Sequence, residues 1–144
     1  MKTMSSIISL KNVFKEYVLG DGSVFSALKK INLEINEGEF SAIVGPSGSG
    51  KSTLMHMIGL LDKPTRGEII INGRNVATID DNQTSTLRNS YVGFVFQQFN
   101  LLNKLTIQEN ILLPATYSRR KLDFDPIARS QMLMEKFGIF SKKD

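Results

Sequence analysis

Hydrophobic and polar positions alternate in the first part of the chain, as they do in strands with one buried face. Ile31, Leu33 and Ile35 are separated by polar residues, and this period of two predicts a strand that is buried on one side and wet on the other. Apolar positions within residues 7–14 indicate an earlier strand, and residues 20–23 a connecting turn. The N-terminal part is therefore predicted to consist of β-strands.

Short continuous apolar runs occur further along and are typical of fully buried strands. One run covers residues 40–44, between Gly38 and Gly45, and another covers residues 92–96. Strands of this kind suit a parallel sheet that is covered on both faces. A third run, at residues 69–71, is followed by Asn-Gly, which is a strong hairpin signal. These runs predict a parallel core sheet with an antiparallel flank.

Helical periodicity appears between these strands. Apolar residues at positions 54, 57, 58 and 61 form one helical stripe. Asp80, Asp81 and Asn82 are predicted to cap a short helix that runs towards Arg88, and a paired-carboxylate acid–base site is the alternative interpretation of the two aspartates. Further helices are expected at about residues 106–113 and 126–137. Together the elements predict an α/β fold.

The stretch before the first predicted helix reads GPSGSGKST, at residues 45–53. Two glycines five positions apart, followed by Lys51 and Ser52, match the phosphate-loop pattern. Between a strand and a helix, such a loop directs successive backbone N–H groups at an anion, and the positive end of the helix adds to the attraction. A flexible Gly/Ser loop is the alternative, and the flanking strand and helix argue against it.

Each part of this loop has a predicted role. The backbone N–H groups of residues 48–51 are expected to hold phosphates, and side chains at either glycine of that range would obstruct the approach. The Lys51 ammonium would reach the outermost two phosphates, and Ser52 would bind Mg²⁺ through its hydroxyl. Thr53 either contributes a hydroxyl nearer the sugar or simply begins the helix. The predicted contacts within the loop are Gly45, Ser47, Gly48, Ser49, Gly50, Lys51, Ser52 and Thr53.

Composition narrows the range of functions. The chain has 144 residues, enough for one domain, and 18 Lys and Arg against 14 Asp and Glu give a net charge of +4. The basic residues are scattered apart from a cluster at residues 119–121, which favours a solvated face over nucleic-acid binding. Cysteine is absent and His56 is the one histidine, which argues against a disulfide framework, a thiolate metal site and a histidine-based triad. No run approaches the roughly 18–20 apolar residues that span a bilayer, so we expect the chain itself to be soluble.

Three stretches resemble the ATP-binding subunit of ABC transporters. They are KNVFKEY at residues 11–17, NLEINEGEFSAIVGPSGSGKSTLMHMIGLLDKPTRGEIIING at residues 32–73, and GFVFQQFNLL at residues 93–102. The last stretch, with Leu113 and Pro114, looks most like bacterial exporter ATPases of the lipoprotein-releasing, macrolide-export and peptide-export type. The resemblance implies an ATPase subunit that binds ATP and Mg²⁺ on the cytoplasmic face of the plasma membrane. Its implied partners are a membrane-spanning permease subunit and a second ATPase subunit, with no nucleic acid.

The resemblance also implies two site residues outside the loop. Tyr17 matches the aromatic residue that stacks on adenine, although from the residues alone it is a strand-end aromatic. Gln97 matches the glutamine that approaches Mg²⁺ and the attacking water, and whose loop contacts the membrane subunit. An amide oxygen is a suitable hard ligand, so the implied metal ligands are Ser52 and Gln97. Lys51 and Gln97 are the only supporting catalytic groups that the resemblance implies.

The second half of the family's pattern is not recognised in the sequence. We find no LSGGQ-like signature, no apolar strand ending in Asp-Glu and no later switch histidine, and the LGDGS at residues 19–23 precedes the phosphate loop. The resemblance therefore implies that residues 1–144 are the N-terminal portion of one ATP-binding domain, truncated before the signature motif and the second half of the core. We expect this chain alone to bind ATP·Mg with little hydrolysis. We also expect marginal stability, or self-association through the truncated edge of the sheet.

Two other functions remain open at this point. The first is another class of P-loop NTPase, such as a small kinase or GTPase. Residues 103–106 carry threonine where a guanine reader carries aspartate, which disfavours GTP. The second is a catalytically inactive fragment that binds nucleotide or only associates with a partner. Comparing the affinities for ATP and GTP would separate the first alternative from an ABC ATPase.

Overall fold

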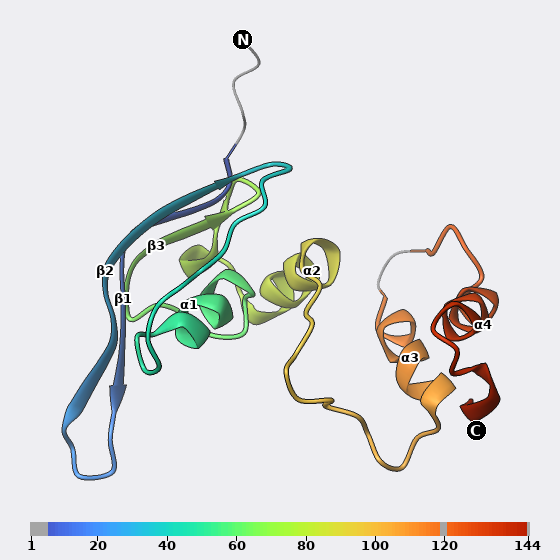
Figure 1. Cartoon of the computed structure of the whole chain (residues 1–144). Helices are drawn as coiled ribbons and strands as arrows, with labels where there is room; N and C mark the ends of the chain where they lie inside the picture. The colour runs from blue at the N-terminus through green and yellow to red at the C-terminus, as the bar shows by residue number, and fades with distance from the viewer. Residues whose placement is uncertain (1–5, 119–120, 144) are drawn as a thin grey trace. The chain divides into compact units, whose positions relative to one another are not determined.

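The computed structural model of the chain describes residues 6–118 and 121–143 (Figure 1). They form two compact units, the first ending at Gly93 and the second beginning at Phe94. Arg119 and Arg120 of the basic cluster lie outside the described residues. The assignment of residues 1–144 to one domain stays a prediction.

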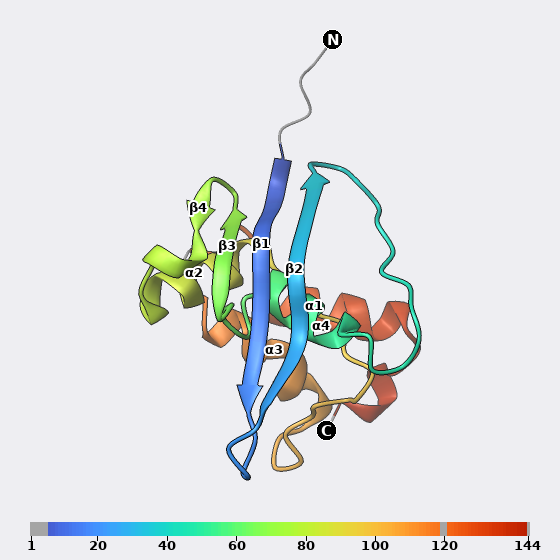
Figure 2. The same ribbon diagram turned by 90° about the vertical axis from the view of Figure 1, so that its left-hand side faces the viewer.

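An antiparallel sheet of four strands dominates the first unit, in the order β2-β1-β3-β4 (Figure 2). The long strands β1 (Ser6–Val18) and β2 (Val24–Asn36) are joined by a turn, in which the N–H of Leu19 donates to the carbonyl of Ser23. Strand β3 (Arg66–Ile71) pairs with β1 and turns through Asn-Gly into β4 (Arg74–Asn75). The predicted strands of this flank, and the hairpin between β3 and β4, are confirmed.

Two helices pack on one side of this sheet, α1 (Lys51–Ile58) and α2 (Asp81–Tyr91), as Figure 1 shows. A short 3-10 helix, η1 (Val76–Thr78), precedes α2. The predicted cap of α2 is confirmed, because the Asp80 carboxylate accepts a hydrogen bond from the Gln83 N–H at 2.7 Å and the Gln83 side chain accepts one from the Asp80 N–H. Sheet and helices enclose one core, made of Leu10, Val13, Leu28, Met57, Leu60, Ile69, Ile71, Val76 and Leu87.

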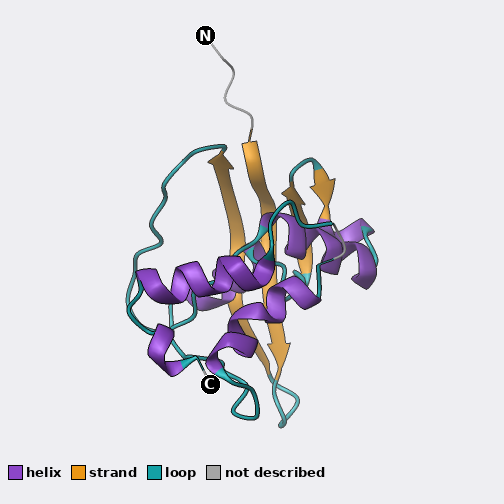
Figure 3. Ribbon diagram, turned by 90° about the vertical axis from the view of Figure 1, so that its right-hand side faces the viewer, coloured by secondary structure: helices purple, strands orange, loops and turns teal. Residues whose placement is uncertain are grey.

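The two apolar runs at residues 40–44 and 92–96 do not form strands, so the predicted parallel core sheet is absent from the residues described. Both runs lie in coil, and the segment between β2 and α1 is a long loop (Figure 3). Phe40, Val44 and Val95 are 99%, 86% and 101% exposed. A buried parallel strand needs hydrogen-bond partners beside it and cover on both faces. None of the four strands extends to these runs, and most of their apolar side chains are exposed, although Val92 packs against the core.

The second unit is helical. Its helices are α3 (Ile107–Thr116) and α4 (Pro126–Lys136), followed by the 3-10 helix η2 (Phe140–Lys142). Thr106 and Asp125 cap α3 and α4 with their side chains, and the buried Met134 lies on α4. Both predicted helices are confirmed. Across the described part of the chain, no helix has the length and apolar character needed to cross a membrane.

Candidate functional site

A pocket lies where the glycine-rich loop meets α1 and strand β2. Its volume is about 520 Å³. The residues that line it are Phe25, Ala27, Ser47, Gly48, Gly50, Lys51, Ser52 and Thr53. Most of the predicted loop contacts therefore face one cavity. Gly45 and Ser49 are not among the lining residues, and the N–H of Ser49 donates to the carbonyl of Pro46 at 3.3 Å.

The start of α1 supplies positive potential to this pocket. Gly50 is the N-cap residue and brings no side chain to the first turn, and the helical hydrogen bonds begin with the N–H of Leu54 donating to the Gly50 carbonyl at 2.8 Å. The N–H groups of the first turn of a helix have no partner within the helix. At this end of α1 they make the pocket attractive to an anion.

Glycine is favoured at the two inner glycine positions of the loop, Gly50 and Gly48, for different structural reasons. Gly50 has φ +88°, and a Cβ there would lie 2.6 Å from the carbonyl oxygen of Ala27 and 3.0 Å from a methyl carbon of Leu28. Gly48 has φ +78°, and a Cβ there would meet no atom within 4 Å. At Gly50 the missing side chain lets the loop approach β2. The expectation that side chains at these two positions would obstruct phosphates stays a prediction.

The ammonium group of Lys51 lies against the loop itself. It donates to the carbonyls of Gly45 and Pro46, at 2.9 and 2.6 Å. These bonds tie the beginning of the loop to the first residue of α1. Lys51 is the only residue with a cationic side chain among the described residues that line the pocket.

Tyr17 lies at the end of β1 and pairs with Phe25 on β2. Residues directly opposite each other in an antiparallel pair point to the same face of the sheet, so the Tyr17 ring lies on the same face as the pocket-lining Phe25. The phenol donates to Asp62 at 3.1 Å, and the Lys15 ammonium lies 4.9 Å from the ring centroid. Partial burial and the Asp62 carboxylate raise the pKa of Tyr17, while Lys15 and the hydroxyl of Thr53 act in the opposite direction.

Sequence reasoning missed Phe25, Asp62 and Lys15. The register of the β1–β2 hairpin identifies Phe25, but that register contains shifts that the alternation of residues does not reveal. Asp62 contacts Tyr17 across 45 positions of sequence, and no local pattern indicates such a contact.

Gln97 belongs to the second unit, where it is exposed in a segment without helix or strand. Its approach to Ser52 and a shared metal ion therefore stays a prediction. Ser52 itself is exposed at the start of α1, so its hydroxyl is accessible to a ligand. Within residues 6–118 and 121–143, no group of three or more His, Cys, Asp or Glu side chains is placed to hold a metal.

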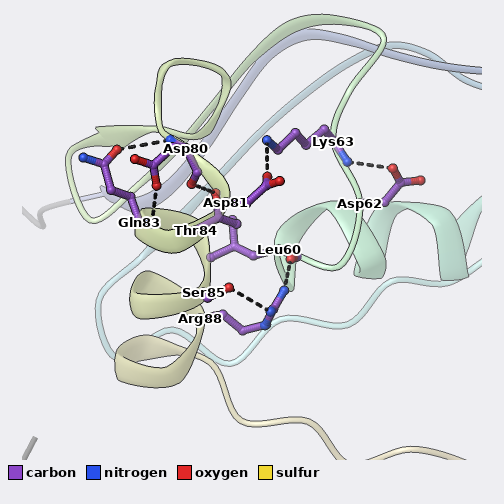
Figure 4. A network of polar contacts seen from close by, with 9 residues as sticks. All are labelled: Leu60, Asp62, Lys63, Asp80, Asp81, Gln83, Thr84, Ser85 and Arg88. Atoms are coloured by element: carbon purple, nitrogen blue, oxygen red, sulfur yellow. Dashed lines mark hydrogen bonds and ion pairs between the residues drawn. The ribbon is translucent and has the colours of Figure 1, made fainter. Parts of the chain in front are cut away.

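The two aspartates at the start of α2 have different structural partners. Asp80 caps the helix, while Asp81 forms an ion pair with Lys63 at 2.9 Å (Figure 4). These separate structural partners favour the helix-cap interpretation over a catalytic carboxylate pair.

Comparison with known proteins identifies the family to which the chain is similar. The model of the ABC transporter family matches residues 28–144. The macrolide export ATP-binding/permease protein MacB of Bdellovibrio bacteriovorus is 44% identical over 133 residues, which cover 92% of this chain and 20% of that protein. The ABC transporter ATP-binding protein MJ0796 of Methanocaldococcus jannaschii is 50% identical over 114 residues, which cover 79% of this chain and 48% of that protein.

A solved structure of the MJ0796 cassette is also similar. It is described as a dimeric, post-hydrolysis state bound to ADP and Pi, and it matches with a TM-score of 0.79 at 44% identity. The match covers 89% of this chain and 56% of the MJ0796 chain. The chain thus spans between a fifth and about half of the length of these relatives.

Proposed function

The chain belongs to the ABC transporter family of ATP-binding proteins, and from this membership we propose that it binds ATP·Mg²⁺ as part of the ATPase that powers a membrane exporter. The observation that carries the proposal is the pocket between the GPSGSGKST loop, α1 and β2. Its volume of about 520 Å³ lies within the usual range for small-molecule sites. The pocket combines a helix N-terminus, hydroxyl groups and one ammonium group, which together suit a polyphosphate.

The proposed contacts follow from the positions of these groups. The N–H groups at the start of α1 and the Lys51 ammonium hold the phosphates, and the hydroxyls of Ser52 and Thr53 lie beside them. Mg²⁺, when bound, neutralises and orients the phosphates, and the Ser52 hydroxyl and Gln97 amide oxygen are the groups that we propose to hold it. Tyr17 provides a face on which the base stacks.

We further propose that this chain alone hydrolyses ATP poorly. Phosphoryl transfer to water depends on a group that positions or deprotonates the attacking water, and on charge stabilisation around the γ-phosphate. Of the described residues that line the pocket, none carries a carboxylate or an imidazole. Robust turnover by the purified chain that disappears in Lys51→Ala would contradict this part of the proposal.

Isothermal titration calorimetry with ATP and Mg²⁺ tests the binding itself. Lys51→Ala removes the ammonium, and charge-assisted hydrogen bonds contribute about 1.5–3 kcal/mol each, so we expect affinity to fall at least roughly tenfold. Lys29→Ala is the matched control, because it removes the same charge from an exposed position on β2. Equal affinities of both variants and the parent chain would refute the phosphate-loop assignment.

The proposed partners come from the relatives and from exposed apolar surface. MacB is named as an export ATP-binding/permease protein and the MJ0796 cassette as dimeric. We propose a membrane-spanning permease subunit and a second ATPase subunit as partners, at the cytoplasmic face of the membrane. Large apolar side chains are also exposed in each unit, Phe40 and Val44 in the first and Val95 and Phe99 in the second, and self-association of the chain would remove such surface from water.

A further inference from the structure

Tyr17 is anchored through its hydroxyl to a residue outside the phosphate loop. The phenol donates to Oδ2 of Asp62 at 3.1 Å. Asp62 follows α1, which begins at Lys51 beside the pocket and ends at Ile58. The same segment therefore carries the phosphate loop before α1 and, after α1, the residue that holds the Tyr17 hydroxyl.

Asp62 is itself held by several hydrogen bonds. Its Oδ1 accepts from the Lys15 ammonium at 2.6 Å and from the backbone N–H of Lys63 at 2.7 Å, the second of which Figure 4 shows. The Lys15 ammonium also donates to the Lys63 carbonyl at 2.9 Å. The Lys15 side chain is 12% exposed and that of Asp62 33% exposed. These two hydrogen bonds to Oδ1 fix the orientation of the carboxylate, in which Oδ2 faces the Tyr17 hydroxyl.

The same cluster distinguishes the two faces of the Tyr17 ring. The Lys15 ammonium lies over the ring, 4.9 Å from its centroid, at a distance typical of a cation–π contact. Lys15 and Tyr17 are two positions apart on β1, so both side chains lie on one face of the strand. Lys15 therefore covers one face of the ring, which confines stacking by a base to the opposite face.

We propose that Asp62 is a positioning residue for the nucleotide base: together with Lys15 it fixes the orientation of the Tyr17 ring, so that one ring face is presented to the base. This inference rests on the proposed function, in which Tyr17 stacks on the base of ATP. The hydrogen bonds of Asp62 go to Lys15, Tyr17 and Lys63, and none goes directly to the phosphate loop, so we expect Asp62 to affect mainly ligands that carry a base. The chemistry that it serves is recognition of a planar ring beside a polyphosphate.

The test compares ATP with inorganic tripolyphosphate, both with Mg²⁺, in calorimetric titrations of the full chain. Stacking of a base on an aromatic side chain increases affinity by up to about a hundredfold. Because a loosened Tyr17 ring would lose part of this gain, we expect Asp62→Asn to lower the affinity for ATP about three- to tenfold. Tripolyphosphate affinity should stay unchanged. Tyr17→Phe, which removes the hydroxyl that contacts both Asp62 and Thr53, should weaken ATP binding by at least as much, and the double variant should be no weaker than Tyr17→Phe.

Asp81→Asn is the matched control, because it breaks the neighbouring Lys63–Asp81 pair, which is 2.9 Å long and exposed, and leaves Tyr17 untouched. The inference would be overturned if Asp62→Asn kept the parent chain's ratio of ATP affinity to tripolyphosphate affinity. It would also be overturned if the double variant lost ATP affinity by the product of the losses in Asp62→Asn and Tyr17→Phe. If Asp62→Asn does not fold, as judged by circular dichroism, Tyr17→Phe decides, and an unchanged ratio in it overturns the inference. Equal ratios in the parent chain and Tyr17→Ala would instead refute the stacking role of Tyr17, and failure of the parent chain to bind either ligand would refute the proposed function.

Discussion

The glycine-rich loop comes close to strand β2 at Gly50, and replacing this glycine by alanine gives a prediction with a calculable size. The new Cβ would lie 2.6 Å from the Ala27 carbonyl oxygen, and φ at this position is +88°. The left-handed conformation costs a residue with a Cβ about 1–2 kcal/mol, and forcing extra atoms into a packed site typically costs about 1–3 kcal/mol. Gly50→Ala should therefore lower the free energy of unfolding by roughly 2–5 kcal/mol, a large share of a typical total of about 5–15 kcal/mol.

Gly48→Ala separates backbone strain from the close contact. Gly48 has a similar φ of +78°, but its Cβ would meet nothing within 4 Å. Only the backbone term of about 1–2 kcal/mol applies. Because Gly48 lines the pocket, this variant should keep most of its stability and lose affinity for ATP.

Urea unfolding followed by circular dichroism measures both variants against the parent chain. We expect Gly50→Ala to be less stable than Gly48→Ala by about 1–3 kcal/mol. Equal losses in the two variants would show that the loop does not press against Ala27, and the explanation of Gly50 given above would be wrong.

Two further predictions concern residues around the site. Partial burial alone would raise the pKa of Asp62, but the hydrogen bonds from Lys15, the Lys63 backbone and Tyr17 outweigh it and hold the pKa below its usual value. The stabilisation by ionised Asp62 is therefore complete well above its unfolded pKa of about 3.9 and is lost as the pH falls through the lower folded value. The stability difference between the parent chain and Asp62→Asn should therefore stay constant from about pH 7 to about pH 5 and shrink below about pH 4. A difference that grows on acidification in urea titrations would contradict that sign. At α2, Asp80→Ala should lower the free energy of unfolding by about 1 kcal/mol, because the cap to the Gln83 N–H is lost, and Asp80→Ser should recover most of it; equal stability of both variants would argue against the cap.

Much of the architecture could be predicted from local patterns. The alternation in β2 is one case: Leu33 packs against the core while Asn32 and Glu34 are exposed. Asp80 and Thr106 begin helices as their side chains indicate. The resemblance to ABC ATP-binding subunits is confirmed by the family match over residues 28–144. Each of these signals is contained within a few neighbouring residues, and for that reason each can be read without coordinates.

Other features could not be predicted in this way. The run at residues 40–44 has the composition of a buried strand, yet Phe40 and Val44 are exposed in coil. Composition shows that a segment can form a strand, but the strand exists only where other backbone groups pair with it. The same limit applies to residues 92–96.

The amino-acid sequence alone determined the phosphate-loop motif, the helix caps and the β1–β2 and β3–β4 hairpins, because short-range periodicity and turn chemistry specify them. Only the tertiary structure decided that Gly50 is needed against Ala27, that Asp62 holds Tyr17, and that Phe25 lines the pocket. These contacts join residues that lie far apart in the sequence. They depend on how strands and helices pack, which no local pattern of residues encodes.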